Sequence, residues 1–202
     1  MDEICWATPL YEFVRLCDAS ELDKRVLDCG AGGSEPPLAL FHQRGYRTCG
    51  VEIQHEQLTK AQRYCRERGL QLGIFCGDMR HLPFADASFP FVYAFNAIFF
   101  MTKPDVARAM DEIKRVLMPG GLCYVNFLAM EDPDWSPFRP DSRVAQFLGT
   151  KHFAHHGDAE ADAFFKGYEI LRREKRWIDK LHNERRHKEV WIEYIARKPS
   201  DT

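Results

Sequence analysis

The sequence lacks a long apolar run, and it has no excess of charge of either sign. Its longest apolar run, Phe89 to Met101, contains Pro90 and Asn96 and is too short to cross a bilayer. Lys and Arg number 28 against 30 Asp and Glu, so the formal net charge is -2. We therefore predict no membrane span. A polyanion is not expected to be the main partner either, although a chain this close to neutral can still carry a local basic patch.

The sequence also lacks a targeting segment and paired cysteines. Met1-Asp2-Glu3 is acidic where a secretory signal carries basic residues, and no apolar stretch follows. The 7 cysteines cannot all pair within the chain, and none form a Cys-x-x-Cys motif. We therefore expect reduced, mostly buried thiols in a cytoplasmic protein, with no structural metal. No repeat or low-complexity segment is visible.

What the sequence does contain is an alternation of strand and helix patterns along 202 residues, of which 45% are hydrophobic. This length and composition predict a single domain over 1–202. Repeated strand–helix–strand units predict a parallel sheet with helices on both faces, which is a Rossmann-like, doubly wound α/β fold. The predicted strands are Arg25–Cys29, Tyr46–Ile53, Leu70–Cys76, Phe91–Phe95 and Leu122–Ala129, and the predicted helices are Ser34–Arg44, His55–Arg68 and Asp105–Leu117.

The last part of the chain departs from this alternation. Tyr168–Trp177 and Lys188–Arg197 read as strands on either side of a polar turn at His182-Asn183, so they are predicted to be antiparallel. The prediction is a mainly parallel, seven-stranded sheet that ends in an antiparallel hairpin. Residues 1–20 are expected to form a helical lead-in. Residues 131–157, rich in proline, are expected to form a substrate or lid loop, because long irregular connections are usually functional.

A glycine-rich turn follows the first predicted strand. Gly30 and Gly32 would let the chain turn sharply and let a ligand approach the backbone, and Asp28 precedes them. A dinucleotide site wants a glycine at position 35, where Glu35 would repel a pyrophosphate. Asp28 instead suits the sulfonium and ammonium groups of S-adenosylmethionine. A nicotinamide-dependent oxidoreductase is therefore disfavoured.

Polar residues also follow the next three predicted strands, where open α/β sheets bind ligands. Glu52 is placed to accept from ribose hydroxyls and Asp78 from an adenine amine, with Met79 covering the ring. Asn96 is expected to be a neighbour of the cofactor. The candidate cofactor-binding residues are Asp28, Cys29, Gly30, Ala31, Gly32, Glu52, Ile53, Gln54, Gly77, Asp78, Met79 and Asn96.

In combination these segments resemble class I S-adenosylmethionine-dependent methyltransferases, in particular the small-molecule, type 11-like members. The resemblance covers Val26 to about Phe127. The stretches that carry it are Val26 to Gly32, Gly50 to Glu52, Gly77 to Met79, Leu82 to Phe84 and Glu112 to Gly121. It implies methyl transfer by direct displacement. No catalytic residue is assigned, because such a protein mainly supplies position and an electrostatic setting.

Two departures from the family pattern concern the methyl acceptor. Phe99 and Phe100 stand where many small-molecule members carry a histidine, which predicts an apolar acceptor pocket. The segment Asn96 to Phe99 is not the Asn-Pro-Pro-aromatic motif, which disfavours N-methylation of nucleobases. The candidate acceptor-binding residues are Tyr11, Phe99, Phe100, Trp135 and Phe138.

Alternatives stay open at this point. One is a module that binds S-adenosylmethionine without transferring the methyl group. Another is an RNA-directed methyltransferase that uses the basic side chains of the C-terminal hairpin, such as Arg172, Arg173 and Lys175. The segment Lys151 to Asp158 gathers three histidines, which are expected to be solvated rather than metal ligands, although one could act as a base near the acceptor.

Overall fold

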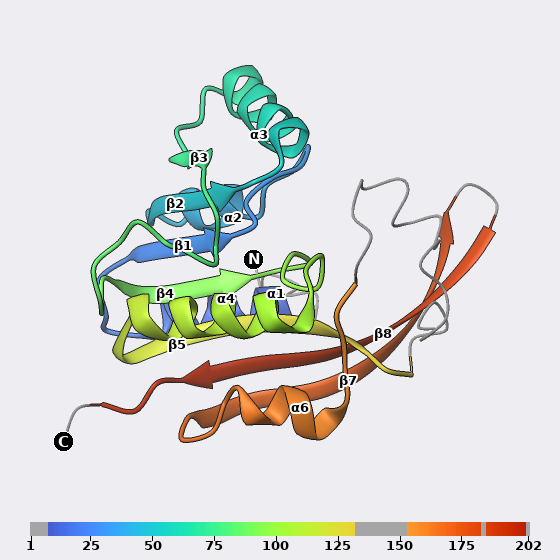
Figure 1. Ribbon diagram of the computed structural model, residues 1–202. Coiled ribbons are helices and arrows are strands. Elements are labelled where there is room, and N and C mark those ends of the chain that lie inside the picture. The colour runs from blue at the N-terminus through green and yellow to red at the C-terminus, as the bar shows by residue number, and fades with distance from the viewer. Residues whose placement is uncertain (1–7, 132–152, 183–184, 201–202) are drawn as a thin grey trace, which may run out of the picture.

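The computed structural model describes residues 8–131, 153–182 and 185–200, and its centre is one mixed, eight-stranded sheet (Figure 1). The strand order is β3-β2-β1-β4-β5-β8-β7, with β6 paired to β5. All pairs among β1 to β6 are parallel, whereas β8 is antiparallel to both β5 and β7. The strands are β1 Arg25–Cys29, β2 Arg47–Glu52, β3 Ile74–Cys76, β4 Phe89–Ala94, β5 Leu117–Ala129, β6 His155–His156, β7 Glu169–His182 and β8 Arg185–Arg197. The predicted fold class is confirmed.

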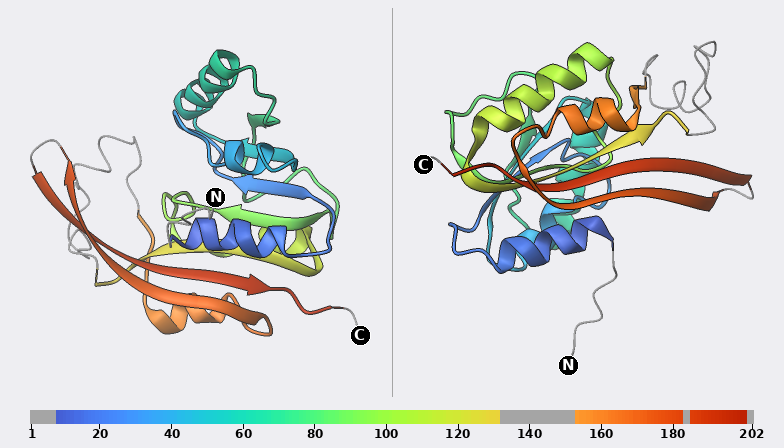
Figure 2. Two further views of the ribbon diagram at one scale, coloured as in Figure 1. Left: turned by 180° about the vertical axis from the view of Figure 1, so that it is seen from behind. Right: turned by 90° about the horizontal axis from the view of Figure 1, so that it is seen from below.

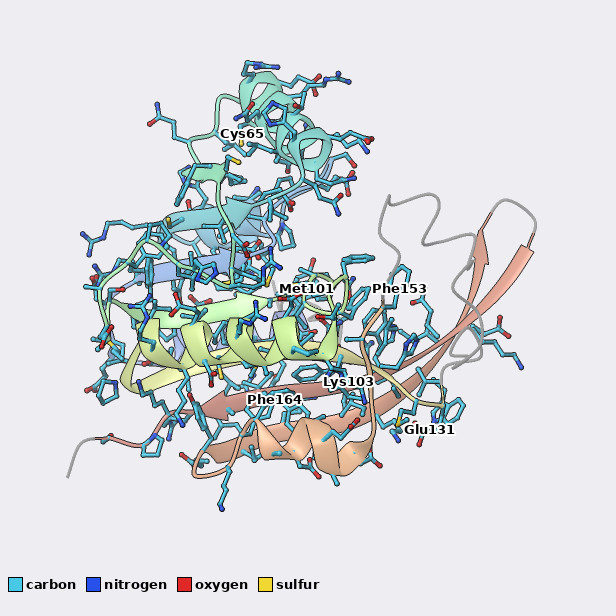
Figure 3. All side chains as sticks on the ribbon, viewed as in Figure 1. Cys65, Met101, Lys103, Glu131, Phe153 and Phe164 are labelled. Atoms are coloured by element: carbon cyan, nitrogen blue, oxygen red, sulfur yellow. The ribbon has the colours of Figure 1, made fainter. Side chains whose placement is uncertain are left out.

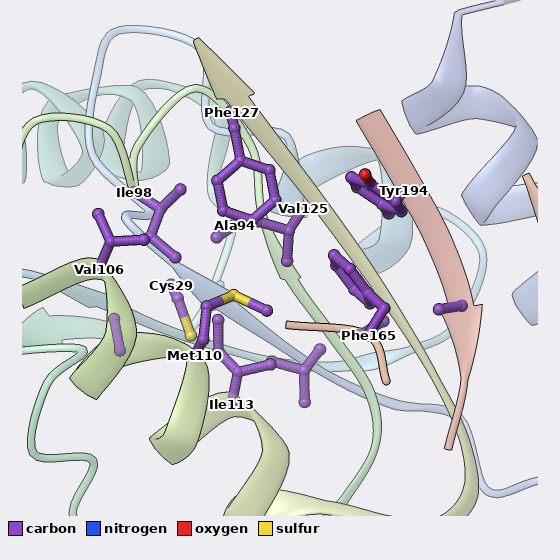
Figure 4. Close-up of a cluster of buried hydrophobic side chains, with 14 of the residues drawn as sticks. Cys29, Ala94, Ile98, Val106, Met110, Ile113, Val125, Phe127, Phe165 and Tyr194 are labelled. Carbon is purple, nitrogen blue, oxygen red and sulfur yellow. The ribbon is translucent and has the colours of Figure 1, made fainter. Parts of the chain in front are cut away.

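Helices cover both faces of the sheet, as Figure 2 shows in its view from below. The helices are α1 Pro9–Asp18, α2 Leu38–His42, α3 His55–Arg68, α4 Lys103–Val116 and α6 Asp158–Ala163. Side chains of α1 and α2 pack on one face, in a cluster that includes Phe13, Phe41 and Tyr93. Side chains of α4 pack on the other face (Figure 4), and Ala161 of α6 belongs to the same cluster. The central strand β4 is therefore buried along its whole length, as expected for a strand of a doubly wound sheet.

The helix α4 shows how local sequence sets an element beside the strand ends. Thr102 caps its N-terminus by accepting from the main-chain N–H of Asp105, and Pro104 lies in the first turn, where no N–H is needed. Val106, Met110 and Ile113 recur at helical spacing and are buried against β4 and β5. This holds the N-terminus of α4 at the edge where the parallel strands end.

Several element boundaries differ from the predicted ones. The helix α2 begins only at Leu38, because a residue that precedes proline disfavours the helical backbone, and Glu35 and Pro36 each precede one. The strand β5 begins at Leu117, before the Pro-Gly-Gly turn where a break was expected. Leu117 pairs with Phe89 and Leu122 with Phe91, so the turn is a bulge inside the strand.

The C-terminal hairpin is longer than predicted. Its pairing runs from Glu169 and Arg197 to His182 and Arg185. Because β5 pairs with β8 only as far as Trp191, the distal part of the hairpin extends past the sheet as a two-stranded ribbon (Figure 2). The strand β6 and the helix α6 were not predicted. Over the described ranges, no helix combines the length and apolarity needed to span a bilayer.

Candidate functional site

A pocket of about 450 Å³ opens at the carboxyl ends of β1, β2, β3 and β4. This volume lies in the range of small-molecule sites, and the position is where open α/β sheets bind ligands. Its walls come from the turns after these strands and from the N-terminus of α4. The lining residues are Gly30, Gly32, Val51, Glu52, Ile53, Gln54, Gln57, Gly77, Asp78, Met79, Arg80, Asn96, Ala97, Phe100, Met101, Thr102 and Asp105.

The glycine turn forms the floor of this pocket. Gly30 has a φ of +107°, and a Cβ placed on it would lie 2.3 Å from the Cβ of Ala97. A Cβ on Gly32 would lie 2.5 Å from the Oε2 atom of Glu52. Both positions therefore require glycine, because the turn packs directly against the ends of β4 and β2.

The main-chain N–H groups of the glycine turn are already used within the protein. Those of Gly30 and Ala31 donate to the carbonyl of Val51, at 2.9 and 3.0 Å. Those of Gly32 and Gly33 donate to Glu52 Oε2 at 3.1 Å and to the Gln57 carbonyl at 3.0 Å. A pyrophosphate binds to free N–H groups at such a turn and at the helix behind it, where this chain has two prolines. The geometry therefore disfavours a dinucleotide, in agreement with the argument from Glu35.

Glu52 lies at the end of β2 and is 9% exposed. Its Oε1 atom accepts from the Gln54 N–H at 2.7 Å, and Oε2 accepts from Gly32. Burial raises the pKa of Glu52, while these N–H donors oppose the shift. The carboxyl group is thus held in one orientation at the pocket wall, with lone pairs left for ligand hydroxyls, as a ribose diol requires.

Asp78 lies in the pocket as predicted, but it has a partner that the sequence did not suggest. The Nε and Nη2 atoms of Arg80 donate to its carboxylate at 2.9 and 2.7 Å, which lowers the pKa of Asp78. Arg80 Nη1 also lies 3.2 Å from Asp105, at the start of α4. This ion-pair network joins the end of β3 to α4. The Asp-x-Arg spacing was the one sequence signal for the pair of Asp78 and Arg80. No sequence signal indicated that Asp105 takes part.

Three of the predicted residues, Asp28, Cys29 and Ala31, lie behind the pocket wall rather than in it. All three are at most 1% exposed. Neither carboxyl oxygen of Asp28 has a hydrogen-bond partner among the described residues. Burial raises the pKa of Asp28 to about 8.

Asn96, two residues after the end of β4, lines the pocket in a left-handed conformation with a φ of +52°. Its main-chain N–H donates to Oδ1 of Asn126 at 2.8 Å, and its own Oδ1 accepts from Asn126 Nδ2 at 2.7 Å. Asn126 lies on β5 and is 1% exposed. Asn126 carries no sequence signal, because its contact with Asn96 crosses between strands.

The predicted acceptor residues divide into three groups. Phe100 lines the pocket, and Phe99 packs beside it in an aromatic cluster with Phe153 and Trp191. Figure 3 shows Phe153 and Met101 at the end of the sheet where β4 terminates. Tyr11 is exposed on α1 and does not line the pocket. Trp135, Phe138 and most of the expected 131–157 loop lie outside the described residues.

The predicted histidine cluster is only partly described. His155 and His156 form β6, and His152 lies outside the described residues. His156 is 2% exposed against Phe127 and Phe164, and burial lowers its pKa to about 4. Within the described part of the chain, no group of three or more His, Cys, Asp or Glu side chains could hold a metal ion.

Comparison with known proteins agrees with this geometry. Residues 27–125 match the family model described as a methyltransferase domain. The 24-methylenesterol C-methyltransferase 2 of Oryza sativa subsp. japonica is 34% identical over 105 residues, which are 51% of this chain and 28% of that protein. Methyltransferase GfsG of Streptomyces halstedii is 35% identical over 99 residues, which are 48% of this chain and 35% of that protein. The chain thus spans well under half the length of these relatives.

Solved structures show the same fold. The structure of a SAM-dependent methyltransferase from Methanosarcina mazei superposes with a TM-score of 0.64 at 20% identity, covering 93% of this chain and 98% of that one. The family model matches the segment that contains most of β1, the glycine turn, Glu52, Asp78 and Asn96. Residues 27–125 therefore belong to the methyltransferase domain family, and the chain has the fold of an S-adenosylmethionine-dependent methyltransferase.

Proposed function

We propose that this chain transfers the methyl group of S-adenosylmethionine to a small-molecule acceptor with an apolar portion. The observation that carries the proposal is Glu52, whose two carboxyl oxygens are fixed by N–H groups at the wall of a 450 Å³ pocket over a glycine turn. The pocket fits a ligand with a diol beside Glu52 and a cationic centre, because acidic side chains dominate its charged lining.

The proposed cofactor-binding residues are those that line the pocket at the strand ends. Glu52 would take the ribose hydroxyls, and Ile53 and Met79 would enclose the adenine near Asp78. When bound, S-adenosylmethionine supplies an activated methyl group, which an acceptor nucleophile takes as S-adenosylhomocysteine is released. The protein's own contribution is to hold both partners in line and to exclude water. Asp28 lies behind this wall and is therefore left out of the set that would touch the cofactor.

An apolar acceptor is supported by the aromatic cluster beside the pocket. Phe100 faces the pocket, and behind it Phe99 and Trp191 are each 5% exposed. Concave small-molecule sites are mostly apolar with a few polar groups. The relatives point the same way, since one is a 24-methylenesterol C-methyltransferase. Transfer to RNA is less well supported, because the basic side chains from Arg172 to Arg176 in the hairpin are paired with acids, for example Arg173 with Asp162.

The test of the cofactor site is Glu52→Ala. Charge-assisted hydrogen bonds are worth about 1.5–3 kcal/mol, so we expect S-adenosylmethionine to bind about 10- to 100-fold more weakly by calorimetry. Glu56→Ala is the matched control, since Glu56 is 78% exposed on α3 and does not line the pocket. Unchanged affinity of the folded Glu52 variant would contradict the site.

The test of transfer is a screen of apolar and aromatic small molecules for formation of S-adenosylhomocysteine. Turnover with a member of this set supports the proposal. Tight S-adenosylmethionine binding without turnover on any acceptor would instead identify a binding module.

A further inference from the structure

Asn126 and Asn96 form a reciprocal amide pair whose orientation is fixed by one main-chain group. A main-chain N–H can only donate, so the Asn126 atom 2.8 Å from the Asn96 N–H must be oxygen. The other end of the Asn126 amide is then its NH₂ group, which can only donate, and the Asn96 atom 2.7 Å from it must be oxygen as well. The NH₂ group of Asn96 is therefore the end of the amide that Asn126 does not hold.

The surroundings support this pair as a fixed feature of the site. Asn126 is 1% exposed, whereas Asn96 is exposed and lines the pocket. Asn96 adopts a left-handed backbone, which asparagine tolerates better than most residues. The buried partner therefore fixes both the backbone and the side chain of a residue that faces the ligand.

A hydrogen-bond donor is valuable at this end of the pocket. Ala97 lies against Gly30, so Asn96 is beside the glycine turn, whose own N–H groups are used internally. The nearby cation Arg80 is held by Asp78 and Asp105. If the ribose lies at Glu52 and the adenine near Asp78, the amino-acid end of the cofactor extends toward the glycine turn and Asn96. Its carboxylate needs donors there.

We propose that Asn126 is a positioning residue, which holds the Asn96 amide so that its NH₂ group donates to the amino-acid carboxylate of the cofactor. This inference rests on the proposed function, because it assumes that S-adenosylmethionine and its product occupy the pocket. It assigns a role to a buried side chain that touches the ligand only through Asn96.

The experiment is a double-mutant cycle read by calorimetry with two probes. The variants are Asn126→Ala, Asn96→Gly and the double variant, and glycine is chosen because it keeps the left-handed backbone. The probes are S-adenosylhomocysteine and S-adenosyl-3-thiopropylamine, which is the same molecule without its carboxylate. Asn126→Ser is the second variant if Asn126→Ala does not fold.

We expect each single variant to bind S-adenosylhomocysteine about tenfold more weakly, the loss that one charge-assisted hydrogen bond gives. The double variant should match Asn96→Gly within about twofold, because Asn126 acts only through Asn96. Affinity for the thiopropylamine should hardly change in any variant.

A role in folding alone predicts a different pattern. The Asn126→Ala loss would then persist in full on the Asn96→Gly background, or would affect both probes equally, and either result overturns the proposal. Wild-type affinity of Asn126→Ala for S-adenosylhomocysteine overturns it too. A wild-type chain that binds neither probe would instead contradict the proposed function.

Discussion

At the scale of single residues, Asp28 is a carboxyl group that water does not reach. It follows the apolar part of β1 and is 1% exposed. Its pKa of about 8 means that the folded chain holds a proton there at pH values where the unfolded chain has lost it. The stability that this proton provides is present at low pH and is lost as the pH rises toward 8.

We therefore predict that Asp28→Asn changes the pH dependence of stability. The variant should be about as stable as the wild type near pH 4, and more stable at pH 8, where the wild type must bury a charge. Urea unfolding across this range measures the difference. Asp111→Asn, at an exposed position of α4, is the control. Parallel stability curves for Asp28→Asn and wild type would contradict the buried titration.

Gly30 and Gly33 provide a matched pair in the same turn. Both have a positive φ, but a Cβ on Gly33 meets nothing within 4 Å, whereas one on Gly30 meets Ala97. Gly33→Ala should cost about 1–2 kcal/mol from backbone strain. Because of the clash, Gly30→Ala should lower the free energy of unfolding by about 1–3 kcal/mol more than Gly33→Ala does. Adding Ala97→Gly should restore part of this loss. Equal losses for the two alanine variants in denaturant unfolding would rule out the clash.

The sequence predicted which residues lie at the strand ends, and the cofactor-binding roles of these residues stay a prediction. Of the predicted cofactor set, the residues that line the pocket are Gly30, Gly32, Glu52, Ile53, Gln54, Gly77, Asp78, Met79 and Asn96. It could not separate them from Asp28, Cys29 and Ala31, because strand pleating decides which side chains face inward. Asp105 and Asn126 were missed because their partners lie far away in the sequence.

At the scale of elements, the hairpin is tied to the sheet by a buried ion pair. Glu193 on β8 is 1% exposed, and it accepts from the Tyr124 hydroxyl at 2.7 Å and from Arg176 on β7. A buried carboxylate strongly destabilises the fold when its cationic partner is removed. The pair therefore ties β7 to β8, and the Tyr124 hydroxyl ties β8 to β5.

Replacing only one partner of this ion pair should lower the stability of the fold. Arg176→Met leaves Glu193 buried without its cation, and we expect a loss of about 3 kcal/mol, near the lower end for such pairs because Arg176 is partly exposed. Adding Glu193→Gln should recover most of this loss. Arg197→Met, which removes an exposed pair with Glu169, should cost less than about 1 kcal/mol. Chemical denaturation measures the free energy of unfolding of each variant. A double variant that is as unstable as Arg176→Met would contradict the explanation by an unpaired buried charge.

The elements that could be predicted are those with strong periodicity and clear ends. The helix at His55–Arg68 was predicted with its observed bounds, because its amphipathic pattern ends at Gly69 in a left-handed cap. The strand β6 is too short for any pattern and exists only through pairing with β5. The strand β3 was predicted from residue 70, but pairing with β2 begins only at Ile74. Tertiary pairing, not propensity, decides these bounds.

At the scale of the whole molecule, charge separates the two acceptor classes. The net charge is -2, and basic residues of the hairpin, such as Arg172 and Lys175, are paired with acids. We predict only weak binding to mixed-sequence RNA between about 50 mM and 200 mM salt, measured by fluorescence anisotropy. Tight binding that falls about a thousandfold or more over this range would favour RNA as the acceptor.

The strand order has a consequence for synthesis of the protein on the ribosome. The last strand in the chain, β8, lies between β5 and β7, which are made before it. While Arg185–Arg197 is still in the exit tunnel, one edge of the buried strand β5 has no partner, and β7 has no place in the sheet. Exposed apolar edges of this kind invite pairing between nascent chains. The sheet can therefore close only after Arg197 has left the tunnel, and until then the open edge of β5 favours aggregation.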